Sequence, residues 1–557
     1  MNGETVEDEL LIPGGRIFQE TMTADPDRPS SDADNDSPAR SRRDRSPAPA
    51  PTIRPPTTDH NDRSTPPGPS GLPLIGSALA QRRDPFGFTT RCARTYGDVV
   101  RIDYPRRSFY QLSHPAYAEY VLVDNDRNYV KGDFFNAVLD PVTGSGLLGS
   151  EGLEWRRQRQ LVQPAFQPEQ VSGHAETMAR FASRLTDQWN DGDLRNIKSD
   201  MSRLALEIVA AALFDVDLQE SVSEIETALT TVMAHSKRQS GKLLSVPRWV
   251  PTASNRRYDQ ALETLDGIVA SIIGQRRADY SGRTDVLSML LSAAAEQDVE
   301  VSDRELRDQV MTLLVAGHET TALVLTYALY LLARHPRVEA TLAEEVGRLS
   351  GKGSLIDAAG IDTGTGTGTA TGSEAGPETL AYTEAVVRES MRLYPPAHST
   401  FREAVNADTI GGYHIPEGAT IKLSQWAIHR DPRFYADAKA FRPERWTTDA
   451  DAAVGTGADR ETNADTGAHA NVEADADADT GTQVRTESDR HRFAFFPFGG
   501  GPRRCIGDRF ALLEATLVLA TIMREYHLEL VSDPPLDLVY TITTRPADPI
   551  AMRIHKR

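Results

Sequence analysis

A single cysteine, Cys505, stands in a glycine-rich, arginine-flanked stretch, 493–510, that leads into an apolar helical pattern. One thiolate is too few for a four-thiolate zinc or iron–sulfur site, but a thiolate held by backbone donors can be the axial ligand of a haem iron. On residue type alone, an unpaired cysteine is more often a buried thiol without a reactive role. The residues around it decide between these two interpretations.

The stretch carries the pattern Phe498-x-x-Gly501-x-Arg503-x-Cys505-x-Gly507. Its glycines allow positive φ and a close approach of backbone to a ligand. Amides around the cysteine and the start of a helix near Gly507 favour the charged thiolate, and Arg503 is a permanent cation that can reach a carboxylate of a macrocycle. This pattern resembles the cysteine-ligand loop of the cytochrome P450 family, which implies that Cys505 binds the iron of haem b.

A second motif lies inside a long apolar helical pattern, where 316–321 reads Ala-Gly-His-Glu-Thr-Thr. A threonine there can hydrogen-bond to a carbonyl one turn earlier, and with Gly317 it can distort the helix and open a groove for dioxygen. Taken alone, the motif is more often a kinked core helix. It resembles the oxygen-binding helix of the same family, which implies catalytic roles in proton transfer for Thr320 and Glu319.

A haem also needs partners for its two propionates. The resemblance implies four such residues, Trp155, Arg159, Arg402 and Arg503. Trp155 and Arg159 are four residues apart, so they share one face of a predicted helix. Each of the four could equally be a packed tryptophan or a solvated surface cation. His429 is expected to make hydrogen bonds in a loop and not to bind iron.

A glutamate and two arginines form a third pattern. Glu389 and Arg392 lie three residues apart on a predicted helix, and Arg445 follows in the segment 441–446. By spacing alone this is a modest surface pair. The family has such a triad near its haem loop, and we therefore expect these three residues to be structural.

Composition limits the partners and the cellular location that we expect for this protein. Its net charge is −19, but the acidic residues gather in low-complexity segments, so no nucleic-acid partner or strongly acidic folded surface is expected. Two cysteines exclude a disulfide framework. The acidic N-terminus carries no secretory signal, and the apolar run 311–333 contains ionisable residues, which predicts a buried helix in place of a transmembrane anchor. We expect a cytoplasmic, soluble protein, and the scarcity of lysine suggests a halophilic or high-GC source.

The chain divides into a predicted disordered tail, 1–65, and a haem domain, 66–557, interrupted by insertions at about 353–378 and 448–490. Helical periodicity predicts helices at 154–166, 202–214, 259–277, 303–333, 337–349, 382–393 and 508–526. Strands are predicted at 99–104, 108–112, 414–422 and between 536 and 554. The resemblance implies a mainly α fold with small β-sheets, a triangular helical prism around a buried haem.

The resemblance implies a haem-thiolate monooxygenase that inserts one oxygen atom of O2 into a C–H bond or C=C bond of a hydrophobic substrate. A fatty acid, terpenoid or carotenoid is the expected substrate class. A haem-thiolate isomerase or peroxygenase is one alternative, although the intact Glu319-Thr320 pair argues for oxygen activation. A non-catalytic haem sensor or electron carrier is another, and it would need no substrate cavity.

No flavin or ferredoxin module follows the haem region, so electrons from NAD(P)H are expected to arrive through a separate ferredoxin-type or flavodoxin-type partner. Four arginines near the cysteine loop are candidates for a basic docking face for an acidic redox protein: Arg156, Arg157, Arg504 and Arg509. They could also be ordinary surface charges. The protein is expected to be a monomer.

Overall fold

The structure is a computed structural model that describes residues 65–557 except for 106, 133–139, 220, 241–248, 284, 297–300, 351–354, 360–378, 448–489 and 533–534. The tail predicted at 1–65 and the insertion predicted at 448–490 lie almost wholly outside the described residues, and so does most of the insertion predicted at 353–378. Leu355–Ala358 within the latter forms the short helix α14, with Leu355 and Ala358 buried. Folded contacts are present near the predicted start, where the carbonyl of Pro67 accepts a hydrogen bond from Arg101 at 3.0 Å.

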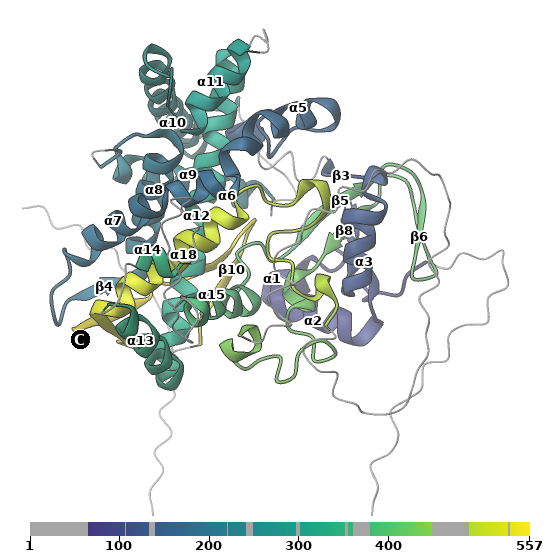
Figure 1. Cartoon of the computed structure of the whole chain (residues 1–557). Coiled ribbons are helices and arrows are strands. Elements are labelled where there is room, and N and C mark those ends of the chain that lie inside the picture. Colours follow the sequence, from purple (N-terminus) through teal and green to yellow (C-terminus); the bar gives the residue numbers. More distant parts are fainter. Residues whose placement is uncertain are drawn as a thin grey trace, which may run out of the picture. The chain divides into compact units, whose positions relative to one another are not determined.

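Helices make up most of the fold, as the sequence predicted (Figure 1). They are α1 (Ala78–Arg83), α2 (Pro85–Tyr96), α3 (Pro115–Glu119), α5 (Gly152–Val162), α6 (Pro168–Gly173), α7 (Ala175–Thr186), α8 (Ile197–Phe214), α9 (Val222–Ser240), α10 (Ala253–Ala278), α11 (Val286–Glu296), α12 (Asp303–Arg334), α13 (Pro336–Ser350), α14 (Leu355–Ala358), α15 (Ala381–Leu393), α16 (Gln425–Ile428) and α18 (Asp508–Glu525). Each of the seven predicted helical segments overlaps one of these helices. Short 3-10 turns follow α5 and precede α18.

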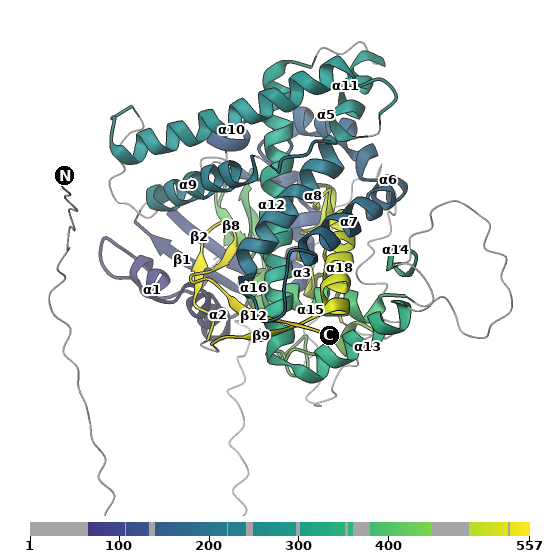
Figure 2. The same cartoon turned by 90° about the vertical axis from the view of Figure 1, so that its left-hand side faces the viewer.

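The longest of these helices, α12, organises the core. It begins at an N-cap, in which the Ser302 hydroxyl accepts a hydrogen bond from the amide of Glu305 at 3.2 Å, and it ends at Arg334, two residues before Pro336. Most of its side chains are buried, and it packs against α8, α15 and α18. Figure 2 shows α12 running through the helical part with α8 and α18 beside it. A feature on α12 is therefore held in place by three further helices.

The strands form four small sheets. They are β1 (Val99–Tyr104), β2 (Arg107–Leu112), β3 (Tyr129–Val130), β4 (Leu194–Asn196), β5 (Thr400–Ala404), β6 (Asp408–Ile410), β7 (Tyr413–Ile415), β8 (Thr420–Leu423), β9 (Tyr526–Leu530), β10 (Leu538–Tyr540), β11 (Thr544–Pro546) and β12 (Ala551–Lys556). The largest sheet has the order β1-β2-β8-β5-β3, and only β2 and β8 pair in parallel. The other sheets are β4-β12-β9, β10-β11 and β6-β7.

One predicted strand is two strands. The segment 414–422 is divided into β7 and β8 by a turn in which Gly418 has φ 73°. A glycine there gives the chain a conformation that other residues adopt only at a cost, so β8 can leave the β6-β7 hairpin and join the large sheet. The consequence is that β8 lies next to β5, which carries Arg402.

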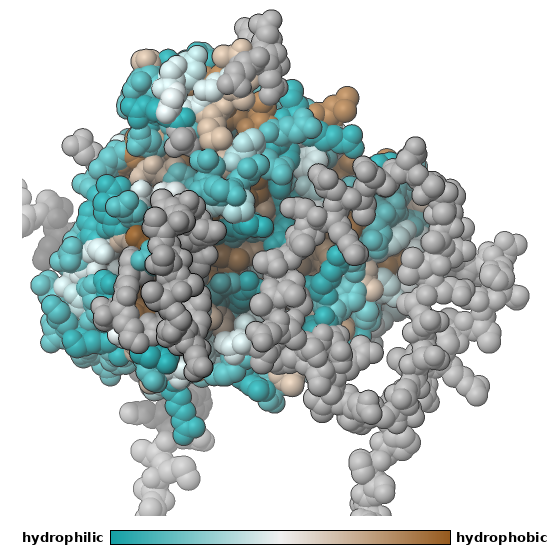
Figure 3. All heavy atoms as spheres, viewed as in Figure 1, coloured by the Kyte–Doolittle hydropathy of each residue, from teal (hydrophilic) through white to brown (hydrophobic). Residues whose placement is uncertain are grey.

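Among the described helices, α12 is long and apolar enough to cross a membrane, with a mean hydropathy of 1.2 in its most apolar window. Because 78% of that window is buried within the fold, it has the character of a core helix. This agrees with the buried helix predicted for 311–333. The face drawn in Figure 3 is mainly hydrophilic with scattered apolar residues.

Candidate active site

The cysteine loop is closed by its own backbone. The amide of Cys505 donates a hydrogen bond to the carbonyl of Phe498 at 3.0 Å, so the chain folds back on itself around three glycines. Gly501 has φ 66°, and a Cβ atom at this position would lie 1.7 Å from the carbonyl oxygen of Leu122. The glycine predicted for close backbone approach is therefore required, because the loop packs directly on the segment that contains Leu122.

The side chain of Cys505 is accessible although protein atoms surround it closely. Burial by the surrounding protein raises its pKa to about 11, and the nearby Asp508 adds to that rise. The amide of Gly507 and the guanidinium of Arg159 act in the opposite direction. The expectation that the helix start favours the thiolate is thus outweighed by desolvation, and a bound metal ion would take the place of the proton.

Two residues one turn apart on α12 are accessible, although most side chains of this helix are buried. Ala316 is exposed and Thr320 is half-exposed, and the Thr320 hydroxyl donates to the carbonyl of Ala316 at 2.7 Å. The predicted back-bond is therefore present. Gly317 does not break the helix, since α12 is continuous, and its missing side chain lets α8 approach: a Cβ there would lie 3.0 Å from a methyl group of Val209.

The carboxylate of Glu319 faces a different direction. It lines a polar cavity of about 420 Å³ between α8, α9 and α12, to which Lys198 and His318 also contribute. There it forms an ion pair with Arg545 and accepts a hydrogen bond from the Thr543 hydroxyl at 3.1 Å. Sequence reasoning missed Arg545 and Thr543, because nothing near them marks the β10-β11 turn as a neighbour of α12.

Three of the four predicted propionate partners lie in one cationic region. Arg402 is buried on β5, and burial together with the charge of Arg503 lowers its pKa to about 10. The guanidinium of Arg503 lies over the ring of Trp155, 4.4 Å from its centroid, and pairs with Glu151. The structure thus brings Arg402, Arg503 and Trp155 together, and their contact with a propionate stays a prediction.

Arg159 lies elsewhere around the same loop. Its guanidinium donates to the carbonyl of Arg504 at 2.9 Å, one residue before Cys505. Burial lowers the pKa of Arg159, and Cys505 and Asp508 offset part of that effect. In this position the guanidinium supports the cysteine loop, and contact with a propionate stays a prediction.

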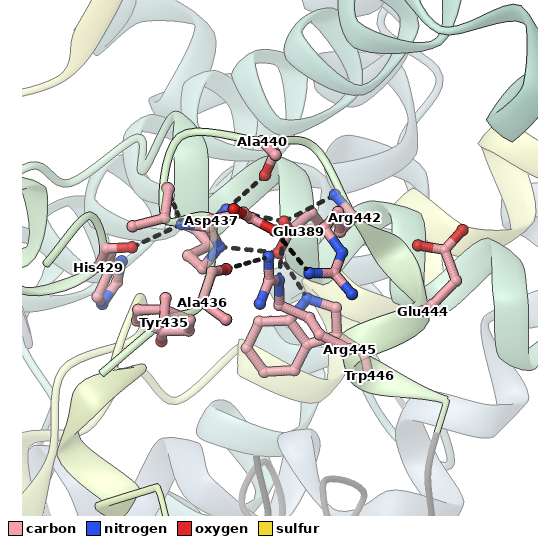
Figure 4. A network of polar contacts seen from close by, with 12 residues as sticks. Glu389, His429, Tyr435, Ala436, Asp437, Ala440, Arg442, Glu444, Arg445 and Trp446 are labelled. Atoms are coloured by element: carbon pink, nitrogen blue, oxygen red, sulfur yellow. Dashed lines mark hydrogen bonds and ion pairs between the residues drawn. The ribbon is translucent and has the colours of Figure 1, made fainter. Parts of the chain in front are cut away.

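The glutamate and two arginines form the predicted network, and all three side chains are fully buried (Figure 4). Glu389 accepts two hydrogen bonds from Arg392 at 2.8 Å, one from Arg445 at 3.0 Å and one from the Trp446 indole at 2.9 Å. Arg392 also donates to three backbone carbonyls of the segment 429–440. The network therefore ties α15 to the segment that precedes the cysteine loop, a structural role.

His429 is a loop hydrogen-bonder, as expected. Its Nε2 accepts a hydrogen bond from the amide of Phe496 at 3.0 Å, and its own carbonyl accepts from Arg392. Burial, together with the charges of surrounding arginines, holds the pKa of His429 well below its usual range. The imidazole is therefore neutral and links the network to the start of the cysteine loop.

Comparison with known proteins identifies the family. The family model "Cytochrome P450" matches residues 66–550. The chain is 34% identical over 483 residues to cyclooctatin synthase of Streptomyces melanosporofaciens, covering 86% of this chain and 92% of that protein. It is 32% identical over 467 residues to pentalenene oxygenase of Streptomyces avermitilis, covering 84% and 91%. The crystal structure of the cytochrome P450DA haem domain superposes with a TM-score of 0.71 at 25% identity, covering 89% of this chain and 98% of that one.

The chain belongs to the cytochrome P450 family, and it is an oxidoreductase of the monooxygenase class. The family implies a haem, and the residues present fit one. The accessible Cys505 offers an iron ligand, while exposed Ala316 and half-exposed Thr320 give α12 an open face. Arg402 and Arg503 are cations placed in a desolvated region where a carboxylate would stabilise them.

Proposed function

We propose that this protein is a haem-thiolate monooxygenase that inserts one oxygen atom of O2 into a C–H bond or C=C bond of a hydrophobic substrate, and that this substrate is a terpenoid. The observation that carries the reaction type is the open face of α12, where Ala316 and Thr320 are accessible in a helix whose side chains are mostly buried. The terpenoid class is supported by the relative named pentalenene oxygenase, whose name gives a hydrocarbon as the molecule that is oxygenated.

In this proposal each residue has a defined task. Cys505 binds the iron, and Arg402, Arg503 and Trp155 hold the propionate side of the haem. When bound, the haem supplies the activation of dioxygen. Thr320 holds a hydroxyl proton at Oγ1 on the open face of α12, and Glu319 exchanges protons with the polar cavity that it lines.

Electrons reach the protein, in this proposal, from NAD(P)H through a separate ferredoxin-type or flavodoxin-type protein in the cytoplasm. The four predicted docking arginines differ in exposure. Arg157 pairs with Glu305 and Arg504 with Asp508, whereas Arg156 and Arg509 are the exposed members of the set. Exposed cations beside the cysteine loop favour an acidic partner, and their effect on association falls with rising salt concentration.

A spectral titration tests the substrate class. Purified ferric protein is titrated with cyclic C15 and C20 hydrocarbons, with fatty acids of matched carbon number and with β-carotene. A blue shift of the Soret band that saturates at micromolar hydrocarbon supports a terpenoid. Saturation by fatty acids or by carotene alone would replace the terpenoid with that class, and no response to any of the three would contradict a hydrophobic substrate pocket.

A further inference from the structure

Two buried polar side chains of α12 each keep one hydrogen-bonding atom without a partner in the part of the chain that the structure describes. They are Gln309 and Thr312, each 3% exposed, and the atoms are Gln309 Nε2 and Thr312 Oγ1. A buried donor that makes no hydrogen bond costs free energy, so native folds rarely keep one. Two such atoms within one turn of a helix indicate that a ligand supplies the missing partner.

The backbone fixes which end of the Gln309 amide is free. The amide of Leu147 can only donate a hydrogen bond, and it donates to Oε1 of Gln309 at 3.3 Å. The nitrogen Nε2 is therefore the end without a partner. Because this nitrogen is a donor, the ligand atom that it needs is an acceptor.

Thr312 differs from two other threonines of the same helix. Thr320 and Thr326 each donate to the carbonyl one turn earlier, at 2.7 and 2.6 Å, whereas the hydroxyl of Thr312 makes no such bond. It packs instead against Gly146, where a Cβ atom would lie 2.2 Å from Oγ1. The hydroxyl of Thr312 is thus available to a ligand.

Both polar residues belong to the face of α12 that is open further along the helix. At about 100° per residue, they fall within a sector of about 80° that also contains Ala316 and Thr320. Thr312 precedes Thr320 by about 12 Å along the helix axis, at 1.5 Å per residue. A molecule that lies along this face can be oxidised near Thr320 while its far end reaches the two polar residues.

The charges around this pair favour a neutral ligand group. Among the described residues, Arg307 is the cation in contact with the segment 142–147, since it donates to the carbonyl of Val142. Arg307 is also ion-paired with both Asp266 and Asp308. A ligand carboxylate would therefore meet no uncompensated cation at this place, and burying it there would be costly.

We propose that Gln309 and Thr312 bind a neutral oxygen group of the substrate, a hydroxyl or a ketone, and that the substrate is a terpenoid that already carries oxygen. The inference rests on the proposed function, because it takes the open face of α12 as the place of oxidation. Gln309 donates to the oxygen, and Thr312 donates to it or accepts from it. A reaction that installs oxygen on the hydrocarbon skeleton must precede this one.

Terpenoids that share one skeleton test the ligand group. Abietadiene, abietadienol and abietic acid form one set, and valencene and nootkatone form a smaller one. Each compound is titrated against purified ferric protein, and the blue shift of the Soret band gives its Kd. We expect the alcohol and the ketone to bind about tenfold more tightly than their hydrocarbons, because a hydrogen bond to a buried donor contributes about that much. Abietic acid should bind no more tightly than abietadiene.

Three variants identify the residues that recognise the oxygen. Thr312→Val removes the hydroxyl and should lower the preference for the alcohol to about threefold, and adding Gln309→Met should abolish it. Thr326→Val is the matched control, because it removes a buried hydroxyl that bonds to its own helix, and it should keep the full preference. Thr312→Val should be as stable as the wild type in urea, since its hydroxyl makes no hydrogen bond that would be lost.

The possible results separate this inference from the proposed function. Equal affinity of the wild type for alcohol and hydrocarbon would overturn the inference alone, as would a full preference in Thr312→Val or any preference in the double variant. Tighter binding of abietic acid than of abietadienol would overturn the neutral ligand group. A red shift with abietadienol would place its oxygen at the iron and overturn the inference too. A lack of response to every compound would contradict the hydrophobic pocket on which the proposed function depends.

Discussion

Glu319 on α12 is ion-paired with Arg545 on β11, and this contact turns the carboxylate toward the polar cavity. The hydroxyl of Thr320, one residue later, instead bonds back to Ala316 on the open face of the same helix. Consecutive residues on a helix point about 100° apart, so the acid and the alcohol serve two sides of α12. In our account Glu319 exchanges protons with the cavity, and Thr320 presents its hydroxyl on the open face.

Replacing Glu319 with glutamine tests the acid's part in the reaction. The amide keeps an acceptor for Thr543 but cannot carry the proton, so we expect product formation to fall about tenfold or more. Substrate binding, read as the Soret shift, should be unchanged. Thr543→Val is the matched control, since it removes a hydrogen bond to Glu319 and leaves the carboxylate. Full product formation by Glu319→Gln would exclude a catalytic role.

Two glycines of the cysteine loop form a second matched pair. Both have positive φ, but a Cβ at Gly499 meets no atom within 4 Å, whereas one at Gly501 meets the Leu122 carbonyl at 1.7 Å. Gly499→Ala should cost about 1–2 kcal/mol of backbone strain. Gly501→Ala should displace the loop and abolish most haem binding. Bound haem per protein and urea unfolding measure both, and equal haem content in the two variants would refute the packing argument.

The buried network predicts a large loss of stability. Glu389→Ala leaves the guanidiniums of Arg392 and Arg445 buried without their carboxylate, so the free energy of unfolding should fall by about 3–5 kcal/mol. Glu384→Ala removes a more exposed carboxylate, the ion-pair partner of Arg388, and should lower the free energy of unfolding by about 1 kcal/mol or less. Urea denaturation of both variants provides the comparison, and similar losses would contradict the role of burial.

Stability should fall as the pH is lowered from about 6.5 to about 4. Burial lowers the pKa of His318 to about 4 and that of His398 to about 3, whereas both lie near 6.5 in an unfolded chain. In this pH range the histidines bind protons in the unfolded state but not in the folded state. Each histidine therefore lowers the free energy of unfolding by about 1.4 kcal/mol for each unit by which the pH falls. In His318→Gln the free energy of unfolding, measured by urea denaturation, should therefore change less with pH between 4.5 and 6.5 than in the wild type. The same slope of this free energy against pH in both proteins would contradict the burial of His318 as the cause.

Local sequence patterns predicted much of this fold and site. Helix α12 could be predicted because its cap, its apolar pattern and the proline after it agree with one another. The Glu389 network was predicted only through a family resemblance, since the spacing of Glu389 and Arg392 alone indicates a surface pair. Its burial depends on how α15 packs on the segment before the cysteine loop.

The remainder depends on contacts between distant segments. Arg545 pairs with Glu319 and Gln309 accepts from Leu147 only because turns and loops bring them together, and neither Arg545 nor Gln309 lies in a motif. The division of 414–422 into two strands depends on one glycine, Gly418, whose conformation was not evident from the alternating pattern. Desolvation of Cys505 likewise arises from the whole fold, so the helix start, whose Gly507 amide does lower the pKa of Cys505, was not enough to predict that this pKa is raised overall.

The carbon monoxide difference spectrum of freshly reduced protein tests the central claim most directly, because the position of the Soret band reports the ligand opposite carbon monoxide. We predict a thiolate-type band in the wild type and its loss in Cys505→Ser, with the fold retained by circular dichroism. An imidazole-type band in fresh native protein, or a thiolate-type band that survives in Cys505→Ser, would contradict the account.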